Sequence, residues 1–138
     1  RRRAADGVIL GSPVYHGSYS AAFRSFHDYC SFDEYEHTVV GLLCSAGGGT
    51  IAGTLGDMRS TVRGVHGWTL PLEVGLRGAR NMFEDRDRDP DPGELGSDSQ
   101  YRFTDESTRA RTCKLGYRVG TYAKRAPEFI ALDDEPEW

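Results

Sequence analysis

Two short segments combine residue types that could hold a flat ligand. They are Pro13-Val14-Tyr15-His16-Gly17-Ser18 and Ala46-Gly47-Gly48-Gly49. In the first, a proline fixes the backbone and a glycine lets it turn, so the residues between them are presented on a rigid frame. Rigid backbone N–H and C=O groups beside aromatic surface are what a ring such as a flavin needs. An ordinary turn with one partly buried tyrosine explains the first segment equally well.

The glycine segment allows a ligand to approach the backbone closely at the start of a predicted helix. Free N–H groups there favour anionic or electron-rich ligand edges. Gly47-x-Gly49-x-x-Ala52 also matches the dinucleotide-binding fingerprint, with Glu73 as a distant acidic partner. The match is weak, because the fingerprint belongs after the first strand of its domain. The phosphate-loop lysine is absent, which argues against a Walker-type nucleotidase.

Both segments follow predicted strands. The apolar runs 7–11 and 38–44 are typical of parallel strands buried on both faces. A third strand is predicted over 68–74, and Pro71 places it at or near a sheet edge. Residues 12–17 are predicted to be a loop, and 81–100 a mobile polar loop.

Three helices are predicted to accompany these strands. The first is capped by Ser18 or Ser20, runs to about Cys30 and has one apolar face (Ala22, Phe23, Phe26, Tyr29). The second has Thr50 as its N-cap, ends at Gly67 and buries Ile51, Leu55, Met58, Val62 and Val65. The last covers 104–125, ends before Pro127 and directs Leu115, Val119 and Tyr122 to the sheet.

Strands that alternate with helices predict one α/β domain over residues 1–138, a doubly wound parallel sheet in three layers, α/β/α. In such sheets ligands bind at the carboxyl ends of the strands, where both candidate segments fall.

The composition of the chain argues against several classes of function. The formal net charge is -4 and no basic face stands out beyond Arg1–Arg3, which argues against nucleic-acid binding. No apolar run reaches membrane-spanning length. Cys30, Cys44 and Cys113 form no Cys-x-x-Cys pair, which favours buried free thiols in a reducing cytoplasm. His27, His37 and His66 lack metal-ligand spacing and are interpreted as surface or satisfied packing residues. We expect no metal site.

A longer stretch of the sequence resembles a known family. Ala5-Asp6 opens the first strand, Ser12-Pro13-Val14-Tyr15 follows it, and the first helix carries Arg24-Ser25 and Asp28. This pattern resembles the NAD(P)H-dependent FMN reductases of flavodoxin-like fold, which have Thr/Ser-Pro-x-Tyr and then Leu-Lys-Asn-x-x-Asp. The resemblance runs from about Ala4 to Leu76 and returns loosely in the last helix. Arg24-Ser25 stands where the family usually has Lys-Asn, which keeps the charge and changes the reach.

The resemblance implies a flavin oxidoreductase, quinone-reductase-like, in which hydride passes from NAD(P)H through FMN to a flavin, quinone or similar acceptor. It implies that Pro13, Val14, Tyr15, His16, Gly17 and Ser18 line the flavin ring, and that Ala46, Gly47, Gly48 and Gly49 close over its other edge. No side chain is an obvious catalytic acid or base. Tyr15 and His16 are interpreted as positioning residues. A cytoplasmic homodimer or homotetramer is expected.

The family begins with a strand and a Gly-Ser-x-Arg-type loop that grips the FMN phosphate, and residues 1–138 contain neither. The resemblance therefore implies a flavodoxin-like sheet with its N-terminal strands missing. We expect residues 1–138 alone to associate and to bind FMN poorly. Two other classes stay open: a flavin-binding electron carrier without enzymatic activity, and a Rossmann-type dehydrogenase domain that uses the Gly47 loop.

Overall fold

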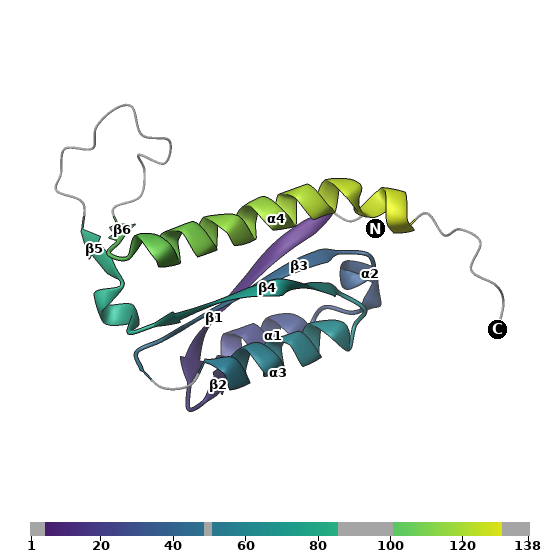
Figure 1. The fold of residues 1–138 in the computed structure, drawn as a ribbon. Coiled ribbons are helices and arrows are strands. Elements are labelled where there is room, and N and C mark those ends of the chain that lie inside the picture. Colours follow the sequence, from purple (N-terminus) through teal and green to yellow (C-terminus); the bar gives the residue numbers. More distant parts are fainter. Residues whose placement is uncertain (1–4, 49–50, 86–100, 131–138) are drawn as a thin grey trace.

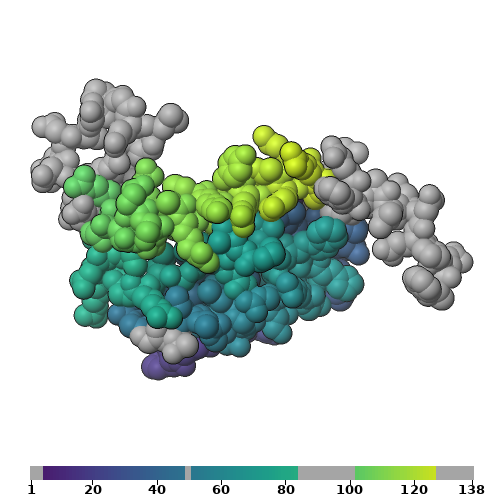
Figure 2. All heavy atoms as spheres, viewed as in Figure 1, coloured from purple at the N-terminus to yellow at the C-terminus, as the bar shows by residue number. Residues whose placement is uncertain are grey.

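A four-stranded sheet lies between two layers of helices. The computed structural model describes residues 5–48, 51–85 and 101–130. One long helix, α4, covers one face of the sheet, and α1 and α3 cover the other (Figure 1). The space-filling view shows α4 lying above the sheet layer (Figure 2). The predicted three-layer, doubly wound α/β arrangement is confirmed.

The sheet has the order β2-β1-β3-β4. Strands β1 (Gly7–Tyr15), β3 (Val39–Ala46) and β4 (Trp68–Arg77) run parallel, and the short β2 (Ser18–Tyr19) is antiparallel to β1. Both crossovers, β1 to β3 and β3 to β4, step in the same direction across the sheet. Right-handed connections of that kind place their helices on one face, which is where α1 and α3 lie.

The first strand is longer than the sequence predicted. We expected a strand over 7–11 and a loop over 12–17, but β1 continues to Tyr15 and then turns into β2. Ser12 and Pro13 stay in the sheet because they pair with Cys44 and Ser45 of β3. Proline has no N–H to donate, yet its carbonyl and fixed φ remain compatible with a strand position of this kind.

The free edges of the sheet differ from each other. Strand β4 is an edge strand, as Pro71 predicted. Its register against β3 shifts between Val40 and Leu42, so β4 carries extra residues around Pro71. On the opposite side β1 pairs with β2 only at Val14 and Tyr15. Within the described residues, the rest of that β1 edge has no strand partner.

The helices under the sheet are α1 (Ala21–Asp28), α2 (Phe32–Tyr35) and α3 (Ala52–Arg63). Ser20 caps α1 as predicted, its Oγ accepting the Phe23 N–H at 3.2 Å. The predicted buried face of α1 is wrong in part. Phe23 is buried together with His27, whereas Phe26 and Tyr29 are 52% and 91% exposed.

Helix α3 buries the stripe that the sequence predicted. Leu55, Met58 and Val62 pack with Ile51 against the sheet, and Val65 packs at the margin of the same core. Alternate β3 residues from Val40 to Ala46 form the other side of this core. The helix ends at Arg63, earlier than the predicted Gly67, and a turn joins the two positions. The predicted cap Thr50 lies outside the described residues.

Helix α4 runs from Glu106 to Ile130. Leu115 and Val119 face the sheet as predicted, but Tyr122 is 45% exposed and Ala123 is buried in its place. The buried stripe follows four-residue steps, and Tyr122 falls one position off it. The helix also continues past Pro127 instead of ending at Arg125.

A small hairpin precedes α4. After the 3₁₀ turn η1 (Ala79–Asn81), β5 (Phe83–Asp85) pairs with β6 (Tyr101–Phe103). The predicted polar loop 81–100 therefore includes strand residues at 83–85, and its remainder, 86–100, lies outside the described residues. The Phe83 and Phe103 rings are 4.8 Å apart, and this contact is long-range, so the local charge pattern did not reveal it.

All three cysteines are free thiols, as expected. Cys44 is buried, and burial raises the pKa of its thiol. Cys30 is half-buried and Cys113 is exposed, so the expectation of burial is wrong for Cys113. Among the helices of the described part, none is long and apolar enough to cross a membrane.

Candidate functional site

The two candidate segments lie side by side at the carboxyl edge of the sheet. Pro13 of β1 pairs with Ser45 of β3, so the chain leaves both strands at neighbouring positions. Hydrogen-bonded strands are about 4.8 Å apart. The hairpin after β1 and the glycine segment after β3 are therefore close enough to border one ligand.

The first segment is a tight β-hairpin. Tyr15 pairs with Ser18, which leaves His16 and Gly17 as a two-residue turn with φ of 53° and 89°. Two positive φ values define a type I′ turn. Glycine adopts positive φ without strain, whereas histidine does so only with an energetic penalty. Tyr15 is 61% exposed and His16 is also exposed, whereas Pro13 and Val14 are half-buried. The turn thus presents one aromatic and one imidazole side chain to solvent at the sheet edge.

Hydrogen bonds anchor this hairpin to α3. Thr54 Oγ1 donates to the Gly17 carbonyl at 3.1 Å, and Ser18 Oγ donates to Asp57 Oδ2 at 2.7 Å. Ser18 therefore uses its hydroxyl proton within the protein, and only its lone pairs and backbone remain for a ligand. Thr54 and Asp57 were not predicted as site residues, because each reaches the turn from a helix that follows the next strand.

The glycine segment is open on its outer side. Ala46 is 4% exposed at the end of β3, and Gly47 and Gly48 are exposed. A Cβ atom placed on Gly47 or Gly48 would meet no heavy atom within 4 Å. The predicted site residue Gly49 lies outside the described residues. Helix α3 begins nearby at Ala52, with Ile51 as its N-cap residue, and no side chain among the described residues forms a capping hydrogen bond at its N-terminus.

These features fit the ring portion of FMN. A side chain would fill the space beside Gly47 and Gly48, so their backbone can approach a flat ligand. The exposed Tyr15 ring stands at the neighbouring strand end. Backbone N–H groups at the start of α3 suit the electron-rich edge of a flavin.

The alternative dinucleotide fingerprint loses its acidic partner in the structure. Both carboxylate oxygens of Glu73 accept hydrogen bonds from Arg59, at 2.7 Å from Nε and 2.6 Å from Nη2. This pairing raises the pKa of the Arg59 guanidinium. Glu73 lies within β4 opposite Leu42, four residues before its end, and not at the strand-end loops. Its carboxylate supports α3 and is not presented to a ribose.

The histidines outside the hairpin differ in how far they are buried and in their contacts. His37 and His66 have positive φ values, and His66 Nδ1 lies 3.8 Å from Glu36 Oε1 at the surface. His27 was expected to be a surface or satisfied residue, and this is wrong. Its side chain is buried, and neither ring nitrogen has a hydrogen-bond partner within the part of the chain that the structure describes.

The sheet order, the helix layers and the strand-end loops together define a flavodoxin-like α/β protein. A solved oxidoreductase from Corynebacterium diphtheriae shares this fold, with a TM-score of 0.60 and 17% identity over 91% of this chain and 57% of that chain. Residues 1–81 match the sequence profile of the NADPH-dependent FMN reductase family, and the chain belongs to this family.

Curated relatives carry related names. An "NADPH azoreductase" from Bacillus sp. (strain OY1-2) is 36% identical over 99 residues, which is 71% of this chain and 51% of the relative. An "FMN-dependent NADPH-azoreductase" from Staphylococcus saprophyticus is 35% identical over 127 residues, 92% of this chain and 61% of the relative. The chain thus spans between half and two thirds of the length of these relatives.

Proposed function

We propose that this chain forms the ring-binding part of an FMN site in an NAD(P)H-dependent flavin oxidoreductase. The observation that carries the proposal is the open glycine backbone at Gly47–Gly48, which lies next to the Tyr15–Ser18 hairpin on the neighbouring parallel strand. Family membership supports the same reading. Bound FMN would supply the hydride-transfer chemistry, from a nicotinamide to a flavin, quinone or similar acceptor.

Two sets of residues would bind opposite sides of the flavin ring. Pro13, Val14, Tyr15, His16, Gly17 and Ser18 hold one side of the ring, and Ala46, Gly47, Gly48 and Gly49 hold the other. Anchoring of the turn by Thr54 and Asp57 keeps the first set in place before the ligand binds. Tyr15 and His16 position the reactants, and no side chain of this set acts as a general acid or base.

The electron donor and acceptor follow from the names of the relatives. Both are called NADPH azoreductases, which supports NADPH as the donor and azo compounds as candidate acceptors. Such acceptors are flat and aromatic, like quinones, and stack readily on an exposed ring.

We also place the protein in the cytoplasm as a homodimer or homotetramer. The three free thiols support a reducing compartment. The Phe26 and Tyr29 rings, which are 52% and 91% exposed, support self-association. Size-exclusion chromatography with light scattering tests the oligomeric state, and a monomer at micromolar concentration would contradict it.

A glycine substitution tests the cofactor site. Gly48→Val places a branched side chain in the open space beside the backbone, where the protein itself has no atom to clash with. In a form of the protein that includes the family's phosphate-binding segment, we expect the variant to fold normally and FMN binding, followed by quenching of flavin fluorescence, to weaken by about 1–3 kcal/mol. Gly120→Val is the matched control, because Gly120 is also exposed with nothing within 4 Å but lies in α4.

The outcomes separate clearly. FMN binding that is weak in Gly48→Val and normal in Gly120→Val supports the site. Equal FMN affinity in the unaltered protein, Gly48→Val and Gly120→Val would show that the flavin ring does not bind beside the glycine segment. Binding of NAD with no binding of FMN after reconstitution would favour the dehydrogenase reading instead.

A further inference from the structure

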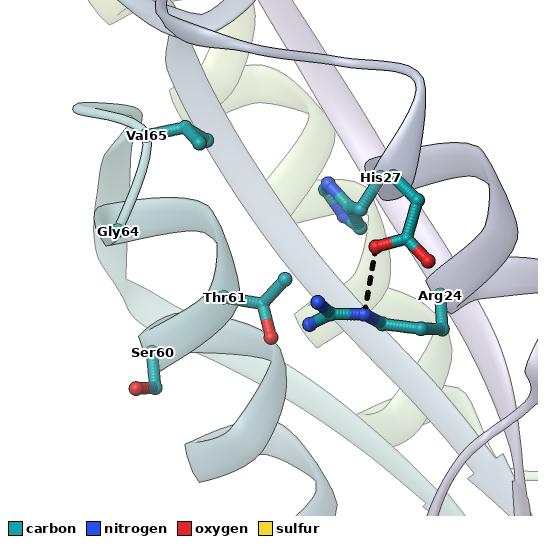
Figure 3. Close-up of a pocket in the computed structure, with 7 residues that line it drawn as sticks. Arg24, His27, Ser60, Thr61, Gly64 and Val65 are labelled. Atoms are coloured by element: carbon teal, nitrogen blue, oxygen red, sulfur yellow. Dashed lines mark ion pairs between the residues drawn. The ribbon is translucent and has the colours of Figure 1, made fainter.

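A cavity lies between α1 and α3, apart from the strand-end loops. It has a volume of about 350 Å³ and is lined by Arg24, His27 and Asp28 of α1, by Ser60 and Thr61 near the end of α3, and by Val65 in the turn that follows (Figure 3). Ser60 comes eight residues after Ala52, which is about 12 Å along the helix axis. Since Ala52 begins α3 at the cofactor edge, the cavity is a separate site. Its volume falls at the lower end of the range of small-molecule sites, about 300–1,000 Å³.

The inner end of the cavity is an imidazole without a hydrogen-bond partner. His27 is 6% exposed, and among the described residues neither Nδ1 nor Nε2 finds a donor or acceptor. Figure 3 shows the ring directed from α1 across the cavity toward α3. The rings of Phe23 and Tyr35 pack against it at centroid distances of 4.4 and 5.2 Å. Buried polar atoms are nearly always hydrogen-bonded, so an orphaned ring aimed into a cavity indicates a ligand that supplies the partner.

The charges of the lining determine what kind of ligand fits. Arg24 Nε and Asp28 Oδ1 form an ion pair at 2.9 Å, so the two charged groups neutralise each other. Burial, and next the positive Arg24, lower the pKa of His27, so the imidazole is neutral at neutral pH. An ionic ligand would enter a half-enclosed space without an unpaired counter-charge, which is unfavourable. The ligand is therefore uncharged.

The hydrogen-bonding groups of the imidazole further limit which functional group the ligand can carry. A neutral imidazole has one nitrogen that accepts and one that donates. A hydroxyl group can donate to the first or accept from the second. Val65 adds apolar surface and Thr61 adds a second polar group to the same cavity.

We propose that the α1–α3 cavity is a binding site for a small uncharged molecule with a hydroxyl group, a phenol or a compact alcohol, which bonds to the His27 ring. The hydroxyl enters first and the carbon body fills the space between Thr61 and Val65. The site is independent of the cofactor loops and of the proposed oxidoreductase activity.

Phenol and toluene are the first pair of probes. They have the same ring, and only phenol can bond to an imidazole. With FMN present in excess to occupy the strand-end site, each compound is titrated into the protein while the His27 imidazole is followed by NMR. We expect phenol to shift the His27 signals saturably and toluene to bind at least about five-fold more weakly. Benzoate, which carries a charge, is expected not to bind.

Three variants locate the binding. Ser60→Trp places a large side chain at an exposed position of the cavity wall and should abolish the phenol shift without altering the core. His27→Phe removes the hydrogen-bond partner and should make phenol and toluene equal. His66→Asn is the matched control, since His66 is exposed, lies outside the cavity and has a φ of 65° that asparagine tolerates.

Several results would overturn the proposal. Equal affinity for phenol and toluene in the unaltered protein would show that phenol forms no hydrogen bond with the His27 ring. Absence of a saturable His27 shift shows that the cavity holds only water or is covered by a second copy. An undiminished phenol shift in Ser60→Trp places phenol elsewhere, and this readout remains available if His27→Phe does not fold.

Discussion

Gly75→Ala is a sharp test of how the sheet positions the glycine segment. Gly75 lies in β4 and pairs with Cys44 of β3. A Cβ atom added there would overlap Ile51 Cδ1 and lie only 3.0 Å from its Cγ1 and 3.3 Å from its Cβ. Ile51 is 9% exposed and forms the N-cap of α3. The new methyl group must therefore push the start of α3 away from the sheet.

The size of the effect follows from the contact. Forcing one methyl group into a packed core costs about 1–3 kcal/mol of unfolding free energy. Ile51→Val removes the overlapped Cδ1 and by itself costs about 0.5–1.5 kcal/mol. In the double variant the new methyl occupies the vacated space, so the total cost should be smaller than the sum of the two single costs by about 1 kcal/mol. Urea unfolding of the four proteins measures this difference.

FMN binding gives the functional readout of the same displacement. Gly75→Ala should weaken FMN binding, and adding Ile51→Val should restore part of it, because only Thr50 separates the glycine segment from Ile51 in the chain. Gly120→Ala, on the exposed side of α4, should change neither quantity appreciably. Additive single and double costs, within about 0.5 kcal/mol, would refute the reasoning.

Three further expectations concern the elements around both sites. Ser20→Ala removes the acceptor for the Phe23 N–H and should lower unfolding free energy by about 1 kcal/mol; an unchanged thermal midpoint would contradict this. Asp57→Ala releases the Ser18 hydroxyl and should weaken FMN binding while the fold persists; unchanged affinity would show that the hairpin needs no such anchor. The lowered pKa of His27, due first to burial, means that the unfolded chain takes up the proton more readily than the folded one. Its contribution to stability is therefore complete above about pH 6.5 and is lost as the pH falls through the lower folded value. Urea midpoints between about pH 7.5 and pH 5 should fall more steeply for the unaltered protein than for His27→Phe, and parallel curves would argue against a buried neutral imidazole.

The strands were predictable where burial alone determines them. The apolar run of β3 belongs to a central strand covered on both faces, and its helix neighbour α3 shows a clear stripe. The end of β1 was not predictable in the same way. Pro13 resembles a loop residue locally, and only its pairing with Ser45, more than thirty residues later in the chain, keeps it in the sheet.

The helix faces show why apolar pattern can mislead. In α1 the buried positions are Phe23 and His27, four residues apart. A stripe drawn through apolar residues alone passes through Phe26 and Tyr29, which are exposed. Burying a histidine instead of an apolar side chain costs hydrogen bonds to water. No pattern in the local sequence predicts that a histidine will occupy such a position. The same buried histidine is one of the residues that line the α1–α3 cavity.

The candidate cofactor site separates into a local and a long-range part. Proline, glycine and the strand ends gave local signals, because their backbone preferences hold in any tertiary setting. The anchors did not, since Thr54 and Asp57 contact residues 37 and 39 positions earlier in the chain. A turn of the type formed by His16 and Gly17 is marked by an X-Gly pair between two strands, and that signal was present in the sequence. Because the anchors hold the turn through hydrogen bonds from α3, substitutions there should change FMN affinity without replacing any of the proposed ring-lining residues. That distinction between lining and anchoring residues comes only from the folded chain.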